Sequence, residues 1–315
     1  MTRQRIAPRP AGGDPGRIGA ARLSRRDFVV LLSAGLILGG AAELPSAPRS
    51  KFAAPGDALQ IVAHEDDDLL FQSPDVLRDV RSGRRIRTVY VTAGDAARDE
   101  SYWSSRERGS LAAYAQMAGV ANRWSTSATA AQGQLIRMLT LTSAPQVSLV
   151  FMRLPDGNRR GTGMIRHNHE SLMRLWQGSI DSIHAVDGSA TYTGDSLRKT
   201  FTDLMTEFRP TTVRTQDWTI PFGTGDNADH TATALFTRQA HHDYGSPENV
   251  LAYAGYPAWV RPANVTGSAL VAKRSAFQAY ALHDPLMCLE PWCAGDWVAS
   301  LRLARQYITA SGAAG

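Results

Sequence analysis

Cysteine is scarce in this chain, with only Cys288 and Cys293 among 315 residues. Two thiols alone do not supply the four ligands of a structural zinc site. The chain also lacks internal repeats and a glycine-rich phosphate-binding loop, because Gly161-Thr162-Gly163 stands alone as a loop sequence. Nothing here predicts a repeat protein or a nucleotide-binding loop.

The folded part also lacks an excess of positive charge. The formal net charge is +5 and the sequence pI is about 9.4. Residues 1–51, however, carry nine Lys or Arg against three Asp or Glu, which leaves the remainder near −1. The basic pI therefore reflects a leader and does not predict binding to nucleic acid.

That leader has the composition of an export signal. Ser24-Arg25-Arg26-Asp27-Phe28 resembles the twin-arginine signal, and the apolar segment 28–42 is followed by a stretch rich in Pro, Ser and Ala. The apolar segment is shorter than the roughly 20 residues of a membrane span. Cleavage after Ala42 and cleavage after Ala47 both fit, and an uncleaved leader would act as an anchor.

We therefore predict a twin-arginine signal peptide and linker over residues 1–50, followed by a single domain over residues 51–315. The protein is expected to be exported by the twin-arginine route and to be secreted or associated with the cell envelope. It would meet a membrane only through the leader during export. Export favours a disulfide between Cys288 and Cys293, whose short loop gives little entropic stabilisation.

One histidine and four acids follow directly on the short apolar run 59–63. Their order is His64-Glu65-Asp66-Asp67-Asp68. An apolar run of this length bounded by charge predicts a buried strand. Neighbouring carboxylates resist joint ionisation, so we expect a positive partner, and His with Asp suits zinc. The alternative is a strand that ends in a solvated acidic turn.

Short apolar runs alternate with helical patterns from residue 57 onward. Strands are expected at 59–63, 86–92, 146–152 and 212–215, and helices at 76–80, 102–118, 195–208, 228–239 and 269–282. This alternation predicts a three-layer, Rossmann-like α/β fold with a mostly parallel sheet and helices on both faces. Ligands of such sheets bind beyond the carboxyl ends of the strands, where His64 falls.

A second cluster, Asp226-Asn227-Ala228-Asp229-His230, follows the strand expected at 212–215 and opens a helix. An Asp-His pair alone is weak evidence, but its position downstream of the first motif makes the combination more specific. Ala63-His64-Glu65-Asp66-Asp67-Asp68 resembles the Ala-His-Pro-Asp-Asp-Glu signature of PIG-L/LmbE-like de-N-acetylases. These are zinc hydrolases that remove acetyl groups from N-acetylglucosamine-type substrates. Glu65 replaces the usual proline, and Asp68 replaces the usual glutamate.

The resemblance implies one zinc ion per chain, held by His64, Asp67 and His230, with a fourth position open for chemistry. Zinc lowers the pKa of a bound water. Asp66 matches the general base that would take the water's proton. Asp229 is expected to orient a ligand, as carboxylates near metal sites often do. The implied substrate is an N-acylated amino sugar.

Two further positions resemble substrate contacts of that family, namely Arg106 and Asp156. Arg108 is a rival for Arg106, and the alternatives are a solvated helix face and a turn-forming aspartate. The segment from Lys273 to His283 resembles a late helix of the family and is expected to pack near the site.

Asn227 departs from the family pattern, which commonly has a second histidine at this place. Asparagine can donate a hydrogen bond to a developing oxyanion but cannot give up a proton. We therefore expect slower chemistry or another residue in that role. A catalytically weak or inactive metal-binding or carbohydrate-binding relative is the alternative function.

The other histidines and the tryptophans are expected to have structural roles rather than to line the metal site. The polar stretch around His167 and His169 predicts surface positions, and His241 with His242 is expected just after a helix end. Trp103, Trp124 and Trp176 are expected in the hydrophobic core. The alternative is that they stack against a sugar in the site.

Overall fold

The computed structural model describes residues 57–245, 249–287 and 298–313. The leader over residues 1–50 and the Cys288–Cys293 pair lie outside the described residues, so export and the disulfide stay predictions. Within the described ranges, no helix combines the length and the hydropathy that crossing a membrane requires.

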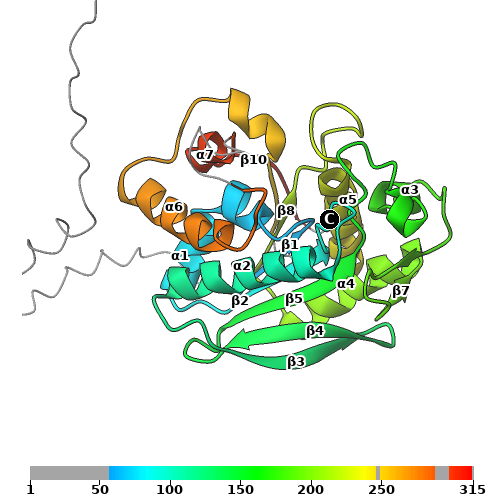
Figure 1. Cartoon of the computed structure of the whole chain (residues 1–315), viewed down its shortest axis with the longest axis horizontal. Helices are drawn as coiled ribbons and strands as arrows, with labels where there is room; N and C mark the ends of the chain where they lie inside the picture. Colours follow the sequence, from blue (N-terminus) through cyan, green and yellow to red (C-terminus); the bar gives the residue numbers. More distant parts are fainter. Residues whose placement is uncertain (1–56, 246–248, 288–297, 314–315) are drawn as a thin grey trace, which may run out of the picture. The chain divides into compact units, whose positions relative to one another are not determined.

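Eight strands form one sheet. They are β1 (Ala58–Val62), β2 (Ile86–Thr92), β3 (Trp124–Ala131), β4 (Gln134–Leu141), β5 (Val147–Leu154), β8 (Thr212–Gln216), β9 (Asn249–Tyr253) and β10 (Ile308–Ala313). The spatial order is β10-β9-β8-β1-β2-β5-β4-β3 (Figure 1). The five central strands are parallel, whereas β10, β4 and β3 run antiparallel to their neighbours. The prediction of a mostly parallel sheet is confirmed.

Helices cover both faces of this sheet. One face carries α1 (Asp75–Arg81), α2 (Glu100–Ala118), α6 (Gly267–Ala281) and the short segment η1 (Asp68–Gln72), with α7 (Val298–Leu303) beside them. The other carries α3 (Leu172–Trp176), α4 (Gly194–Phe208) and α5 (Ala228–Tyr244). The remaining elements are η2 (Ile165–His167), η3 (Tyr256–Val260) and the small hairpin of β6 (Ile183–His184) and β7 (Thr191–Tyr192). The three-layer prediction is confirmed.

Strand β1 shows why the run before His64 is mostly apolar. Its side chains alternate between the two faces: Ala58 and Val62 join the core under α2 and α6, while Leu59 and Ile61 join the core under α4 and α5. Both faces are covered, so apolar side chains dominate the strand, and its one polar residue, Gln60, is buried and hydrogen-bonded to Thr88. The chain passes from β1 to β2 on one side and reaches β8 on the other, which makes the end of β1 a topological switch point.

Most predicted elements are present within a few residues of their expected bounds. Helix α5 is longer than expected, however, because it continues to Tyr244, so His241 and His242 lie inside its last turn rather than after it. The tryptophans lie in or against the core as expected, with Trp103 buried and Trp124 and Trp176 packed on its edge.

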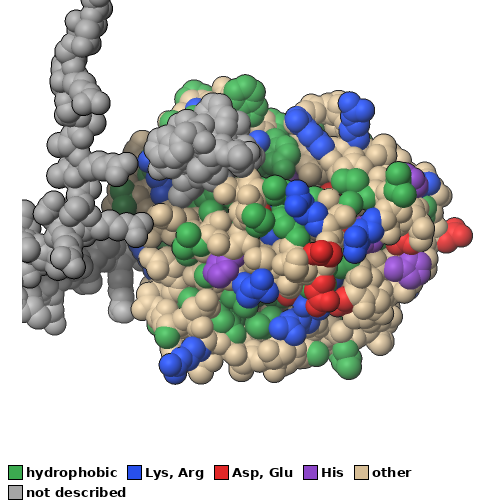
Figure 2. All heavy atoms as spheres, in the orientation of Figure 1, with side chains coloured by type: hydrophobic (Ala, Val, Ile, Leu, Met, Phe, Trp, Pro, Cys, Tyr) green, Lys and Arg blue, Asp and Glu red, His purple; other side chains and the backbone are tan. Residues whose placement is uncertain are grey.

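The antiparallel additions were not predicted. Strands β3 and β4 form a hairpin around Gln132-Gly133, both with positive φ, and β3 is mostly exposed at the end of the sheet. Its sequence alternates Ser, Thr and Ala, so it carries no apolar pattern that would mark a strand. On the face drawn in Figure 2, Lys and Arg side chains are spread among acidic, apolar and histidine side chains.

Candidate active site

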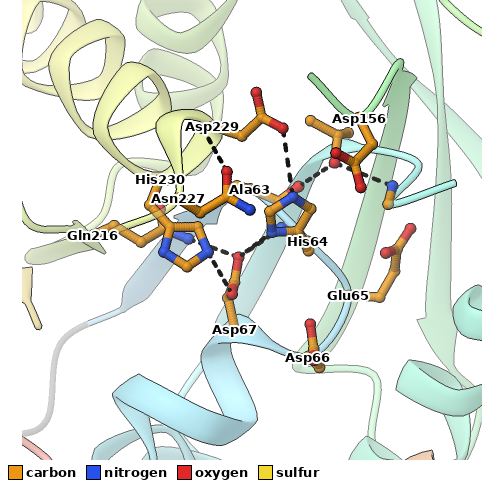
Figure 3. Close-up of polar contacts among 12 residues, drawn as sticks. Ala63, His64, Glu65, Asp66, Asp67, Asp156, Gln216, Asn227, Asp229 and His230 are labelled. Carbon is orange, nitrogen blue, oxygen red and sulfur yellow. Dashed lines mark hydrogen bonds and ion pairs between the residues drawn. The ribbon is translucent and has the colours of Figure 1, made fainter. Parts of the chain in front are cut away.

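The candidate site lies at the carboxyl ends of the central strands. Residues 64–68 follow β1, Asp156 follows β5, and the 226–230 motif opens α5 after β8. Because β1 pairs in parallel with both β2 and β8, these strand ends meet at one edge of the sheet. Three segments that are far apart in the sequence converge there, as Figure 3 shows.

Asp67 lies between two imidazole rings. Its Oδ1 is 3.0 Å from His230 Nε2, and its Oδ2 is 3.1 Å from His64 Nδ1. The ring centroids of the two histidines are 5.3 Å apart, and all three side chains are buried. Gln216, at the end of β8, donates from Nε2 to Asp67 Oδ2 at 2.9 Å. The predicted ligands thus present atoms that lie within 4.8 Å of one another.

The donor set suits a divalent cation. Nε2 of His64 and Nε2 of His230 are buried and make no hydrogen bond with any described residue, and the approach of His230 to Asp67 lacks hydrogen-bond geometry. A buried polar atom without a partner is costly, and a metal ion would supply that partner. Two imidazoles and one carboxylate also match the three protein ligands of a catalytic zinc site.

Electrostatics tie these three groups together. Burial alone would raise the pKa of Asp67, but the two imidazoles hold it well below its usual range. Burial would lower the pKa of His230, but Asp67 and Asp226 raise it to about 10. The pKa of His64 is likewise raised, by Asp67 and Asp229 acting against burial. Protons and a metal ion would therefore compete for the same imidazole nitrogens.

One further carboxylate holds an imidazole in place, and a second lies near the other ring. Asp226 Oδ1 lies 2.8 Å from His230 Nδ1, whereas Asp229 Oδ2 lies 3.6 Å from His64 Nε2, beyond hydrogen-bond distance. Asp229 Oδ2 also accepts from the backbone N–H of Gly157 at 2.8 Å. A carboxylate on a ligand histidine fixes the orientation of the ring. Asp226 was not predicted as a site residue, although its place four residues before His230 at a helix start is a usable signal.

Asp66, the predicted general base, pairs with Arg106 of α2. Arg106 Nη2 donates to Asp66 Oδ1 at 2.9 Å, and both side chains are buried. Burial raises the pKa of Asp66, while the Arg106 guanidinium opposes that rise. Asp66 Oδ2 makes no hydrogen bond with a described residue, so one oxygen of the carboxylate remains for a reactant.

Arg106 is itself held on several sides. Its Nη1 donates to the Gly94 carbonyl oxygen at 2.6 Å and its Nε to the Tyr280 hydroxyl at 2.7 Å. Tyr280 in turn donates to Asp284 Oδ2 at 2.7 Å. Arg108, the rival position, is exposed and donates to Ser104 on the same helix. Of the two arginines only Arg106 reaches the site, and its contact with substrate stays a prediction.

The other two acids of the first motif have separate partners. Asp68 accepts from the hydroxyls of Tyr90 at 3.1 Å and Tyr114 at 2.6 Å, and burial raises its pKa to about 7. Glu65 Oε2 lies 3.5 Å from Arg106 Nη1, and burial raises the pKa of Glu65 to about 8. The four acids therefore do not share one cation. Arg106, two tyrosines and raised pKa values relieve most of the expected repulsion.

The side chains of Asn227 and Asp156 both accept hydrogen bonds from backbone N–H groups two residues further along the chain. Asn227 Oδ1 accepts from the backbone N–H of Asp229 at 2.9 Å and caps α5, a contact typically worth about 1 kcal/mol. Asp156 Oδ1 accepts from the backbone N–H of Asn158 at 2.7 Å, which is the turn role. The Asp156 carboxylate also lies within 4.8 Å of ligand atoms of His64 and Asp229, so it borders the site as well.

His167 is nearer the site than expected. Its Nε2 lies 2.8 Å from Asp95 Oδ2, and Asp95 Oδ1 accepts from the backbone N–H of Asp156 at 2.9 Å. The surface prediction for His167 is therefore wrong, because the buried Asp95 draws its ring inward. His169 is exposed, as predicted.

These features define a buried two-histidine, one-carboxylate cluster beside the buried carboxylate of Asp66, at the switch point of a mostly parallel α/β sheet. The family model of GlcNAc-PI de-N-acetylase, PIG-L, matches residues 59–241, which is more than half of the chain. The chain belongs to this family. A search of curated proteins found no match.

Several solved structures resemble the fold at low sequence identity. The zinc-inhibited form of teicoplanin deacetylase Orf2 is 16% identical, with 76% of this chain and 88% of that chain covered and a TM-score of 0.44. N,N'-diacetylchitobiose deacetylase from Pyrococcus horikoshii is 13% identical, with 75% and 74% covered and a TM-score of 0.42. The 4-carboxy-2-hydroxymuconate hydratase GalB from Pseudomonas putida is 12% identical, with 78% and 82% covered and a TM-score of 0.41.

Proposed function

We propose that this protein is a zinc-dependent hydrolase that removes an N-acetyl or other N-acyl group from an N-acetylglucosamine-type substrate. One observation carries the proposal: the buried His64, Asp67 and His230 cluster has unpartnered imidazole nitrogens and lies beside Asp66. Family membership supports the same chemistry, because the matched segment contains all four residues.

The residues of the chain suit amide hydrolysis. A zinc ion held by His64, Asp67 and His230 would supply Lewis acidity and lower the pKa of a water. Asp66 takes a proton from the attacking water through its unoccupied oxygen, while Arg106 keeps the carboxylate oriented. The water oxygen bonds to the acyl carbon, and the C–N bond then breaks. Asp66 returns the proton to the departing nitrogen, which leaves a carboxylate and a free amine.

The twin-arginine signal that the sequence predicts over residues 1–50 supports a place for this reaction outside the cytoplasm. An exported enzyme of this kind would meet cell-envelope glycans, glycolipids or secreted glycosylated metabolites. We propose these as the sources of the N-acylated amino sugar. Export is tested in cells by comparing the location of the wild type with that of the double variant Arg25→Lys, Arg26→Lys. We expect the wild type outside the cytoplasm and the variant retained in it.

A weak or inactive relative is the second candidate, and Asn227 favours it. The side chain at this place caps α5 and has no proton to give. The exchange Asn227→His separates the two candidates. An inactive relative gains acetate release from this change, whereas an enzyme that already has another donor gains little.

The direct test is acetate release from a panel of N-acetylglucosamine compounds. The full chain is assayed with zinc, after chelation, and after zinc is returned. The proposal predicts release that chelation abolishes and zinc restores. Tight zinc binding without hydrolysis of any amide, in the wild type and in Asn227→His alike, would contradict it.

A further inference from the structure

Tyr256, the first residue of η3, is anchored against the site although no sequence motif marks it as a site residue. Its ring packs edge-on against His230, with centroids 5.0 Å apart, and against Phe71 at 5.9 Å. Its backbone N–H donates to Asp226 Oδ1 at 3.0 Å, the same oxygen that contacts His230 Nδ1. Ring and backbone of Tyr256 are thus fixed to a predicted ligand and to the carboxylate that orients it.

The hydroxyl of Tyr256 is not used to hold the fold. It makes no hydrogen bond with any residue in the described ranges. Tyr256 is only partly buried, so a ligand can reach this hydroxyl. The contact between the two rings places the phenol of Tyr256 beside His230, a predicted ligand. A phenol carries its proton at neutral pH, so it can donate a hydrogen bond.

Guanidinium groups flank the same ring. The Cζ of Arg302 lies 4.3 Å from the centroid of Tyr256, and that of Arg159 lies 5.8 Å from it. The carbonyl oxygen of Arg159 also accepts from Ala228, within the motif that supplies His230. Contacts of this kind between a cation and an aromatic ring restrict the position of the ring.

We propose that Tyr256 is a further catalytic residue, whose hydroxyl donates a hydrogen bond to the acyl oxygen of the substrate as negative charge develops there. This assignment rests on the proposed function. It gives the chain a hydrogen-bond donor for the oxyanion on a different loop from Asn227, whose side-chain oxygen caps α5. A neutral phenol needs no proton transfer for this task, since a positioned donor alone stabilises the oxyanion.

The test uses the full chain loaded with zinc and the variant Tyr256→Phe. The phenyl ring keeps the packing on His230, and the backbone bond to Asp226 is unchanged, so only the hydroxyl is lost. Removal of one oxyanion donor typically costs about 100-fold in kcat, and we expect that loss with KM changed less than about threefold. Zinc content should equal that of the wild type.

Tyr192→Phe is the matched control. Tyr192 is 1% exposed, lies under α4 away from the motifs, and its hydroxyl has no partner among the described residues. We expect wild-type kcat from this variant. Loss of activity confined to Tyr256→Phe therefore reports the particular hydroxyl rather than the loss of any buried phenol.

A second readout does not depend on turnover. A phosphonamide of glucosamine carries tetrahedral phosphoryl oxygens that imitate the charged acyl oxygen, and its affinity is measured by calorimetry. We expect Tyr256→Phe to weaken this binding by about the same factor as kcat, because a transition-state contact is lost in both. Binding of glucosamine itself should be unaffected.

Two outcomes overturn the assignment in distinguishable ways. If the wild type hydrolyses the amide and Tyr256→Phe keeps kcat and analogue affinity within about twofold, the role of Tyr256 is wrong and the proposed function stands. If the zinc-loaded wild type releases no acetate and does not bind the analogue, the proposed function fails, and the role of Tyr256 fails with it.

Discussion

Lys273 allows a quantitative test of how the fold supports the site. It lies in α6, is 1% exposed, and donates from Nζ to the carbonyl oxygens of Leu70 at 2.8 Å and Arg305 at 2.9 Å. Leu70 belongs to η1, directly after the ligand motif. Burial lowers the pKa of Lys273 to about 7, against 10.5 for an ordinary lysine, with Asp75 opposing the change.

The sign of the pH dependence follows from proton binding. Between these two pKa values the unfolded chain binds the proton and the folded chain does not, so the free energy of unfolding rises with pH. Below the folded-state pKa both states bind the proton, and the cost of burying the ammonium group is present in full. At about 1.4 kcal/mol per pH unit, Lys273 should add about 2–3 kcal/mol between about pH 6 and pH 9.

The perturbation is Lys273→Met, which replaces an unbranched side chain by one that is a single atom shorter and removes the titrating group. Loss of the two hydrogen bonds gives an offset of about 1–3 kcal/mol that does not vary with pH. The unfolding free energy of the variant relative to wild type should therefore fall by about 2–3 kcal/mol from about pH 6 to pH 9. Urea denaturation at several pH values measures this difference.

A matched control is Lys199→Met. The Lys199 side chain is 51% exposed on α4, so its ammonium group is hydrated in both states. Its variant should differ from wild type by the same amount at each pH. A Lys273→Met difference that changes by less than about 0.5 kcal/mol across the range would refute the buried ammonium argument.

Three further predictions concern the site. Asp226→Asn should weaken zinc affinity about 10–100-fold, measured by competition with a chelating dye, because the carboxylate that orients His230 is weakened; unchanged affinity would contradict this role. Gly255→Ala would place a Cβ 2.7 Å from His230 Nδ1 and against Asp226, so calorimetry should show weaker zinc binding and a lower Tm; a wild-type Tm would argue against so close an approach. Arg106→Met should lower the unfolding free energy by about 3–5 kcal/mol in urea titrations, because buried carboxylates including Asp66 lose their partner; a loss under about 1 kcal/mol would show that these carboxylates do not depend on it.

The sequence predicts the central strands well, because their physical demands are strict. A strand covered on both faces is mostly apolar, as in β1, and a helix on that sheet must repeat its apolar residues, as Leu197, Phe201 and Leu204 do in α4. Strand β3 escapes prediction because an exposed strand at the end of a sheet needs no apolar alternation. Its hairpin turn at Gln132-Gly133 is the signal that remains.

Some residues of the candidate site are indicated by local sequence motifs, whereas others are brought there only by packing. The resemblance of the first motif to the family signature implies His64 and Asp67 as ligands, and the structure brings them beside His230. The pairing of Asp66 with Arg106 joins residues 40 apart in sequence and depends on how α2 packs on the sheet. Tyr256 likewise reaches His230 only through the packing of η3, which no local pattern encodes.

The central claim is that Asp66 acts on an amide beside a zinc ion, and Asp66→Asn tests it most directly. Zinc content and acetate release are measured on the same preparations of wild type and variant. The account predicts that Asn at position 66 leaves one zinc ion per chain and lowers acetate release by at least about 100-fold, as loss of a general base does. Acetate release at the wild-type rate from the zinc-loaded variant would contradict it.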